Sequence, residues 1–269
     1  MPDNVVALFL LGITAGILSG MFGIGGGVII VPALILIMGY SLKAAAGTSL
    51  AVLVWPVSIF AVIAYYRARL INIRTAVLIS VGLLIGGYFG AEIALGLPDN
   101  IMEPLYGLFL IYVGWRFVEP RKLYRQYVLK QAQANPGEAE AGAPEAAPDR
   151  AWYTTFAVGL LAGIVAGLFG IGGGLVIVPA LVVILGYDQK HAVGTSLAAL
   201  LPPTGLGAVI SYYQDGFIHI AAAAAVAIGL VAGAFFGARI ALGMSSRNVK
   251  RLYGVFLILV SFRFIFQIV

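Results

Sequence analysis

The sequence predicts an all-α membrane protein built from two repeats of opposite topology. The chain has 269 residues, of which 61% are hydrophobic and only 10% charged, with a mean hydropathy of +1.03. A soluble domain does not need so much apolar sequence. The apolar stretches are about 18–25 residues long, the length at which a helix crosses a bilayer core of ~30 Å. A glycine-rich sequence also recurs in both halves, and the basic loops change sides between them.

Recurrence at a fixed spacing divides the chain. The run Gly23–Gly27 returns as Gly170–Gly174, 147 positions later, and Pro32 returns as Pro179. The same offset relates further short sequences: Gly47-Thr48-Ser49 to Gly194-Thr195-Ser196, and Leu105-Tyr106-Gly107 to Leu252-Tyr253-Gly254. Such agreement at one offset indicates internal duplication. We therefore expect a first transmembrane repeat in residues 1–118, a linker in 119–151 and a second repeat in 152–269.

Each repeat is expected to contain five helical pieces. In the first copy these are Val5–Phe22, Val28–Met38, Ala44–Tyr66, Thr75–Leu97 and Ile101–Val118. The second piece rises only ~16 Å at 1.5 Å per residue, about half a membrane, which predicts a half-helix. Pro56, and Pro202-Pro203 in the second copy, predict a kink or an interruption in the third piece.

Loop charges predict the topology. In the first repeat basic residues follow the third piece, whereas in the second repeat Arg247, Lys250 and Arg251 follow the fourth. By the positive-inside rule, the two repeats therefore have opposite orientations in the membrane. In each repeat, the first two helical pieces, which the glycine run separates, must enter the membrane and return to the same side. The three further helices cross it, giving about eight to ten membrane segments in all. Parallel repeats, with the broken pair as one long helix, leave more basic residues outside.

The inverted arrangement also predicts a location. It makes the protein a multi-pass membrane chain with both termini outside the cytoplasm. The linker then lies in the cytoplasm, and its part rich in Ala, Pro, Gly and Glu is expected to be disordered. The net charge of +5 follows from the positive-inside bias, so no nucleic-acid partner is inferred. Glycines that recur every four residues in the first and fourth pieces predict close helix packing.

The glycine run is the candidate functional site. It frees backbone N–H and C=O groups inside the membrane, and these must line a cavity or pack in protein. The half-helix that follows presents its N-terminus, whose N–H groups and partial positive charge favour an anion. The alternative is a kink or a close helix crossing. A nucleotide site is excluded, because no Lys-Ser/Thr pair follows the glycines.

Hydroxyl and charged side chains extend the candidate site. Thr48 and Ser49, like Thr195 and Ser196, are expected to cap a broken helix and donate to an anion, or alternatively to bond their own helix carbonyls. Glu92 and its equivalent, Arg239, are expected to snorkel from near a helix end. The alternative is that they pair or act in gating.

Other polar side chains are assigned simpler roles. We expect His191 and His219 to be solvated in loops, with proton coupling as the alternative. The pairs Tyr65-Tyr66 and Tyr212-Tyr213 are expected in the interfacial aromatic belt. The chain has no cysteine, which excludes disulfides and thiolate metal sites. We infer no catalytic residue, metal or cofactor, because the spans lack the cluster of acids and bases that an enzyme requires.

Energetics constrain the site. One helix terminus contributes about 0.3–2 kcal/mol, whereas burial of a bare anion in a dry, low-dielectric medium costs tens. Several charge-assisted hydrogen bonds and a hydrated vestibule are therefore required. We expect water to reach the site from one side at a time, which is alternating access.

Two copies of a Gly-Xaa-Gly-Gly-Gly run, each followed by Val-Pro-Ala-Leu and Gly-Thr-Ser, resemble the TauE/SafE sulfite exporter family. The resemblance implies a secondary transporter that moves a small sulfur-containing oxyanion, such as sulfite, sulfoacetate or another organosulfonate. It implies transport across the cell inner membrane, usually outward. It assigns substrate binding to Gly23, Gly25, Gly26, Gly27, Thr48, Ser49, Gly170, Gly172, Gly173, Gly174, Thr195 and Ser196. An anion channel of broad selectivity is the alternative. The coupling ion, with a proton as the candidate, and the oligomeric state stay open.

Overall fold

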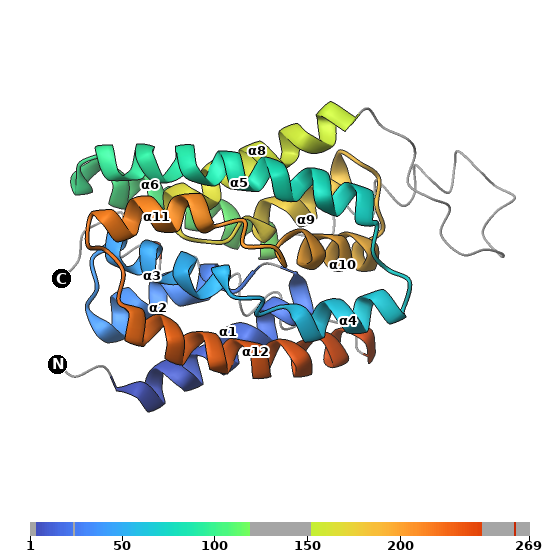
Figure 1. The fold of residues 1–269 in the computed structure, drawn as a ribbon, viewed down its shortest axis with the longest axis horizontal. Coiled ribbons are helices and arrows are strands. Elements are labelled where there is room, and N and C mark those ends of the chain that lie inside the picture. The colour runs from blue at the N-terminus through green and yellow to red at the C-terminus, as the bar shows by residue number, and fades with distance from the viewer. Residues whose placement is uncertain (1–3, 24, 119–151, 244–260, 262–269) are drawn as a thin grey trace, which may run out of the picture. The chain divides into compact units, whose positions relative to one another are not determined.

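The computed structural model describes residues 4–23, 25–118, 152–243 and 261. Within these ranges all regular structure is helical. The helices are α1 (Val5–Phe22), α2 (Gly27–Met38), α3 (Leu42–Val54), α4 (Ile59–Arg67), α5 (Ile73–Gly96), α6 (Asp99–Val118), α8 (Trp152–Phe169), α9 (Gly174–Val183), α10 (Gln189–Ala199), α11 (Leu206–Gln214) and α12 (Ile220–Gly243) (Figure 1). The predicted linker lies outside the described residues, as does the last predicted helix of the second repeat apart from Ser261.

Helix length and composition confirm the predicted all-α membrane class. Four described helices, α1, α5, α8 and α12, are long and apolar enough to cross a bilayer. Helices α3 and α4 add a fifth span if they are counted as one segment bent by 50°. Helices α2 and α9 are apolar but shorter, as expected of half-helices.

The chain forms two compact units. The first contains residues 1–102 and 149–245, and the second contains residues 103–148 and 246–269. All candidate site residues belong to the first unit. In the second, the described part of α6 buries Tyr106, Leu110 and Val113. This division follows packing, so the sequence-based boundaries at 118 and 152 stay a prediction.

Glycine ridges join the long helices of the first unit. Helix α1 packs along α12, and α5 packs along α8. A Cβ atom on Gly16 would lie 2.4 Å from the carbonyl oxygen of Leu230, and one on Gly86 only 2.1 Å from that of Leu160. The backbones therefore approach more closely than any side chain permits. Each pair joins a helix from one half of the sequence to a helix from the other.

Proline interrupts two helices near the middle of the first unit. The predicted piece Ala44–Tyr66 is divided into α3 and α4 at Pro56, where the N–H of Val57 donates to Trp55 O at 2.6 Å. Pro202 divides α10 from α11 in the same way, with Thr204 N–H donating to Pro202 O at 2.6 Å. Because proline offers no N–H to the helix, a tight turn replaces the regular ladder at both points.

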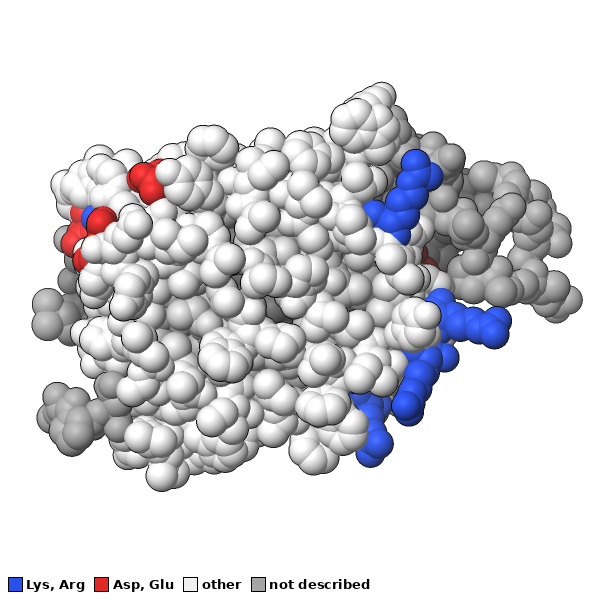
Figure 2. Space-filling model, viewed as in Figure 1, with Lys and Arg blue, Asp and Glu red and all other residues white. Residues whose placement is uncertain are grey.

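Charged side chains separate to opposite ends of the first unit. Figure 2 shows Lys and Arg mainly at the end where α4 gives way to α5, and Asp and Glu mainly at the other. The connection from α4 to α5 carries Arg67, Arg69 and Arg74 and defines the basic end. The acidic end lies where α11 turns into α12, beside Asp215. Helix α5 therefore runs from the basic to the acidic end and α12 in the opposite direction (Figure 1).

The tyrosine pairs differ from the interfacial role expected of them. Tyr66 and Tyr213 are each 61% exposed and fit an aromatic belt. Tyr65 and Tyr212, however, are 2% and 0% exposed. Consecutive helical residues face different directions, and these two rings turn inward to pack on glycines of the Gly-Thr-Ser sequences. A Cβ on Gly47 would lie 3.0 Å from Tyr212 Cβ.

Candidate functional site

The two glycine runs meet in the first unit although 147 residues separate them. A Cβ atom on Gly27 would lie 2.5 Å from the carbonyl oxygen of Gly170. One on Gly25 would lie 3.6 Å from the oxygen of Gly172, and one on Gly172 would lie 3.8 Å from that of Gly25. The candidate anion-binding backbone of both halves is thereby gathered in one place.

Left-handed backbone explains why glycine occupies these positions. Gly25 and Gly26 have φ angles of +82° and +80°, and Gly172 and Gly173 both have +78°. Two successive residues in this region turn the chain sharply into the helix that follows, a geometry that L side chains rarely adopt. Helices α2 and α9 begin directly afterwards, at Gly27 and Gly174.

The helix starts supply backbone donors. In α2 the first hydrogen bonds of the helix run from Ile29 and Ile30 N–H to Gly26 O, at 3.0 and 3.1 Å. The N–H groups of Gly27 and Val28 therefore precede the helical ladder. Helix α9 repeats this pattern, with Val176 and Ile177 donating to Gly173 O. Two helix N-termini, each with partial positive charge, thus lie close to the meeting point of the runs.

The hydroxyls of the Gly-Thr-Ser sequences bond across the two halves of the chain. Ser49 Oγ donates to Gly170 O at 2.7 Å, and Ser196 Oγ donates to Gly23 O at 3.0 Å, both in buried surroundings. In this structure the two serine donors therefore hold the opposite glycine run in place. They neither point to an open site nor bond their own helix.

The neighbouring threonines act as acceptors. Thr48 Oγ1 accepts from His219 N–H, and Thr195 Oγ1 accepts from Asn72 N–H, both at 3.1 Å. His219 precedes α12 and Asn72 precedes α5, so each threonine attaches the start of a long helix from the other half. In each Gly-Thr-Ser sequence the threonine accepts one hydrogen bond and the serine donates another. One short sequence thereby holds two segments of the opposite half of the chain.

A small cavity lies against the middle glycines of both runs. Gly25 and Gly172 line it together with leucines, glycines and three hydroxyl-bearing residues. The lining residues that sequence analysis did not identify include Ser19, Leu50, Leu53, Ser58, Leu83, Gly87, Leu197, Leu200, Thr204 and Gly205. Its volume is about 30 Å³, which is room for about two water molecules. None of the lining residues is charged, so only backbone dipoles and hydroxyls can stabilise an anion there.

Spacing offered a signal for these missed residues. Leu50 and Leu53 correspond to Leu197 and Leu200 at the duplication offset. Leu50 and Leu197 come directly after the Gly-Thr-Ser sequences. Leu53 and Leu200 follow three residues later, on helices already expected to be interrupted. Leucine in an apolar helix carries no functional signal by itself, which is why the sequence did not reveal them.

Glu92 and Arg239 bind separate partners. Glu92 Oε1 accepts a 2.7 Å hydrogen bond from Ser211 Oγ on α11. Arg239 places its guanidinium carbon 4.3 Å from the centre of the Phe235 ring on its own helix. Both side chains are exposed. The structure thus does not bring the two charges together, and neither lines the cavity.

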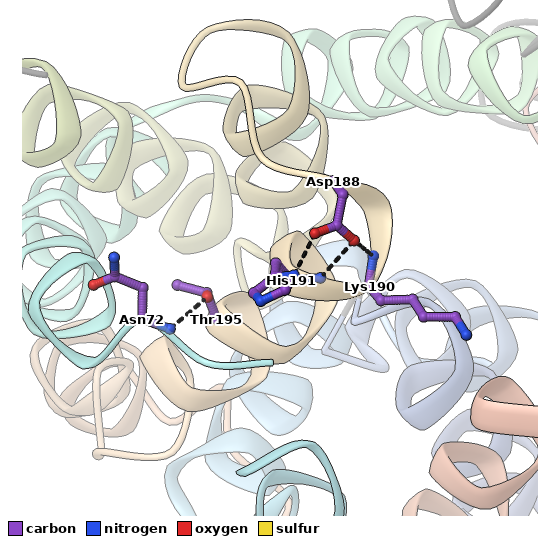
Figure 3. Close-up of polar contacts among 5 residues, drawn as sticks. All are labelled: Asn72, Asp188, Lys190, His191 and Thr195. Carbon is purple, nitrogen blue, oxygen red and sulfur yellow. Dashed lines mark hydrogen bonds and ion pairs between the residues drawn. The ribbon is translucent and has the colours of Figure 1, made fainter. Parts of the chain in front are cut away.

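His191 departs from the predicted solvated loop residue. It lies in the first turn of α10, where its ring contacts the carboxylate of Asp188 and its side chain is 18% exposed (Figure 3). Asp188 also caps α10 by accepting from the N–H groups of Lys190 and His191. His219 is exposed and stacks on Tyr40, with ring centres 4.2 Å apart.

Tyr187 ties the start of α10 to α5. Its hydroxyl lies 2.7 Å from Thr75 Oγ1. Burial raises the pKa of Tyr187, which the bond to Thr75 partly offsets, so the phenol stays protonated and available for that bond at neutral pH.

Comparison with known proteins agrees with this architecture. Residues 8–264 match the family described as Sulfite exporter TauE/SafE. The chain belongs to this family. It is 26% identical to the probable membrane transporter protein YunE of Bacillus subtilis, over 98% of both chains. It is 28% identical to the probable membrane transporter protein MJ0441 of Methanocaldococcus jannaschii, over 90% of this chain and 88% of that protein. No solved structure matches it.

Membership of the TauE/SafE family makes the chain a membrane transporter. Both relatives are named probable membrane transporter proteins, and the chain matches them over most of their length. The described helices include several that can span a bilayer. The family match covers both glycine runs and both Gly-Thr-Ser sequences.

Proposed function

We propose that this TauE/SafE transporter moves a small sulfur-containing oxyanion, such as sulfite, sulfoacetate or another organosulfonate, and chiefly exports it. The cavity between Gly25 and Gly172 carries this proposal, because two helix N-termini begin beside it. Several acceptor oxygens on one anion suit two opposed sets of backbone donors. The bound anion would be a substrate released on the other side of the membrane.

In this proposal the candidate residues divide into two groups. Gly25, Gly26 and Gly27, with Gly172, Gly173 and Gly174, shape the anion site and supply its donors. The residues Gly23, Thr48, Ser49, Gly170, Thr195 and Ser196 hold these runs in position in the closed state. Movement of the serine hydroxyls from a carbonyl to the anion would require the two runs to separate.

Inverted-topology repeats are the proposed basis of transport. The opposite directions of α5 and α12, which correspond at the duplication offset, support this arrangement (Figure 1). The interrupted pairs α3–α4 and α10–α11 line the shared cavity with Val57, Ser58, Thr204 and Gly205. Bending at these breaks would open the site to one side at a time.

The charge distribution supports an orientation in the inner membrane. We place the basic end in the cytoplasm by the positive-inside rule, with the linker there and both termini outside. Export then begins at the basic end, where the local positive potential attracts anions.

Ligand-induced stabilisation tests the substrate class. We expect sulfite or an organosulfonate to raise the unfolding temperature of the purified protein more than chloride does, because binding stabilises the folded state. The doubly substituted variant Gly87→Ala with Gly205→Ala should lose this shift. The nearest heavy atoms to the two new methyl groups lie 3.7 and 3.8 Å away, so they fill the cavity without a clash.

Gly96→Ala provides the matched control, because its added Cβ meets no atom within 4 Å and lies away from the cavity. It should retain the full shift. Equal stabilisation by chloride, sulfate and the sulfonates would indicate a broad anion channel. No shift with any anion would contradict the site.

A further inference from the structure

We propose that the hydrogen bond from Ser211 to Glu92 is a proton-sensitive latch that holds the cavity closed towards the acidic end. The proposal rests on the alternating access proposed above and adds a coupling site to it. The ligand of this new site is a proton, and its acceptor is the carboxylate of Glu92.

The position of the bond supports a latch. Gly87 of α5 and Ala208 of α11 both line the cavity. Both helices run towards the acidic end, and Glu92 and Ser211 lie farther along them (Figure 1). The 2.7 Å bond between these side chains therefore fastens α11 to α5 between the cavity and that end.

Helix α11 is suited to moving as a unit. It follows the interruption at Pro202, which leaves it without a continuous helical connection to α10. Ser211 is 5% exposed, so its hydroxyl is directed into the packed interface. The adjacent Tyr212 donates to the oxygen of Gly167, which also lines the cavity. Docking of α11 thus closes one wall of the cavity.

The corresponding positions at the basic end lack this bond. At the duplication offset Arg239 replaces Glu92 and Ala64 replaces Ser211. Alanine offers no hydroxyl, and the Arg239 guanidinium lies over the Phe235 ring of its own helix. The two ends of an otherwise matched core therefore differ in a titratable contact.

Protonation weakens the latch through its charge. A carboxylate accepts a charge-assisted hydrogen bond, which is about twice as strong as a bond between neutral groups. Adding a proton to Glu92 leaves a neutral acid, so α11 is held less firmly. Proton binding would then favour opening at the acidic end, and proton loss would favour closure.

The charged groups on the described helices around the Ser211–Glu92 contact lie elsewhere on those helices. Glu92 is therefore the titratable group of this contact. Lys43 is associated with Asp99 and donates to Leu95 O, near the end of α5. Asp215 follows α11, which carries no charged residue itself, and α8 carries none either. The charged groups of α10, Asp188, Lys190 and His191, lie at its start, beside Thr75 and the beginning of α5. Arg74 is also at the beginning of α5.

Cysteine labelling tests the latch without any transported anion. The chain lacks cysteine, so Thr204→Cys places a single thiol of similar size against the cavity. Its reaction with a small, water-soluble maleimide is measured across pH in this parent and in variants that add Glu92→Gln or Ser211→Ala. The same thiol is compared in every background, which cancels the pH dependence of its own ionisation.

We expect both variants to react about five- to tenfold faster than the parent at high pH, where Glu92 is charged and the parent is latched. The rates should converge at low pH, because protonated Glu92 resembles glutamine. Asp215→Asn, which removes an exposed acid at the same end, should match the parent throughout.

Equal rates in the parent and in both variants at high pH would overturn the latch. A constant rate ratio across pH would overturn its proton sensitivity. Neither result depends on anion binding, so the latch and the proposed substrate can fail separately.

Discussion

At the scale of single residues, the glycine runs are defined by backbone conformation as much as by space. Gly25 combines a φ of +82° with an added-Cβ distance of 3.2 Å to Leu200 Cδ1. Either feature alone disfavours a side chain. Gly25 also lines the cavity, so the residue that needs a left-handed backbone is one that shapes the candidate site.

Gly25→Ala should therefore destabilise the protein by about 1–2 kcal/mol, the cost of a left-handed backbone for an L residue. Gly96→Ala should be neutral or stabilise by up to ~1 kcal/mol, because it removes backbone freedom from the unfolded chain at the end of α5. Thermal unfolding in detergent measures both. An unfolding temperature for Gly25→Ala equal to that of Gly96→Ala would contradict the described backbone conformation.

At the scale of helices, α5 presents two neighbouring glycines with different functions. A Cβ on Gly86 would lie 2.1 Å from the backbone oxygen of Leu160 in α8, whereas one on Gly87 would lie 3.7 Å from Thr204 O. The first glycine allows the helices to touch. The second leaves room in the cavity.

Gly86→Ala should consequently force α5 and α8 apart and destabilise the protein by about 1–3 kcal/mol or more, as overpacking does. Gly87→Ala should leave stability nearly unchanged. The comparison uses the same substitution in adjacent positions of one helix, so helix propensity is matched. Equal losses of unfolding temperature in the two variants would contradict the prediction that close packing of α5 on α8 excludes a side chain at position 86.

At the scale of the whole molecule, the separation of charges predicts how the protein lies in the membrane. In sealed right-side-out vesicles, a cysteine at Asp215 should react with an impermeant thiol reagent added outside. A cysteine at Arg69 should react only after the vesicles are opened, because the positive-inside rule keeps the basic end inside. The opposite labelling pattern would reverse the proposed orientation.

Sequence reasoning predicted local structure well where the chemistry is local. The start of α1 at Val5 was predicted, and α2 begins at Gly27, one residue before the predicted Val28. Proline accounts for the break after α3 without reference to other elements, because the missing N–H acts at its own position. The family resemblance was confirmed over residues 8–264.

The sequence by itself determined that this chain is an apolar, helical membrane protein with recurring glycine-broken segments, because composition, length and spacing are properties of the chain. Only the tertiary structure decided that Ser49 bonds Gly170, that Tyr65 is buried and that Glu92 meets Ser211. These contacts join residues far apart in sequence, and helical periodicity gives the face of a helix without naming its partner. The cavity has the same origin, because its wall forms only when both halves of the chain pack together.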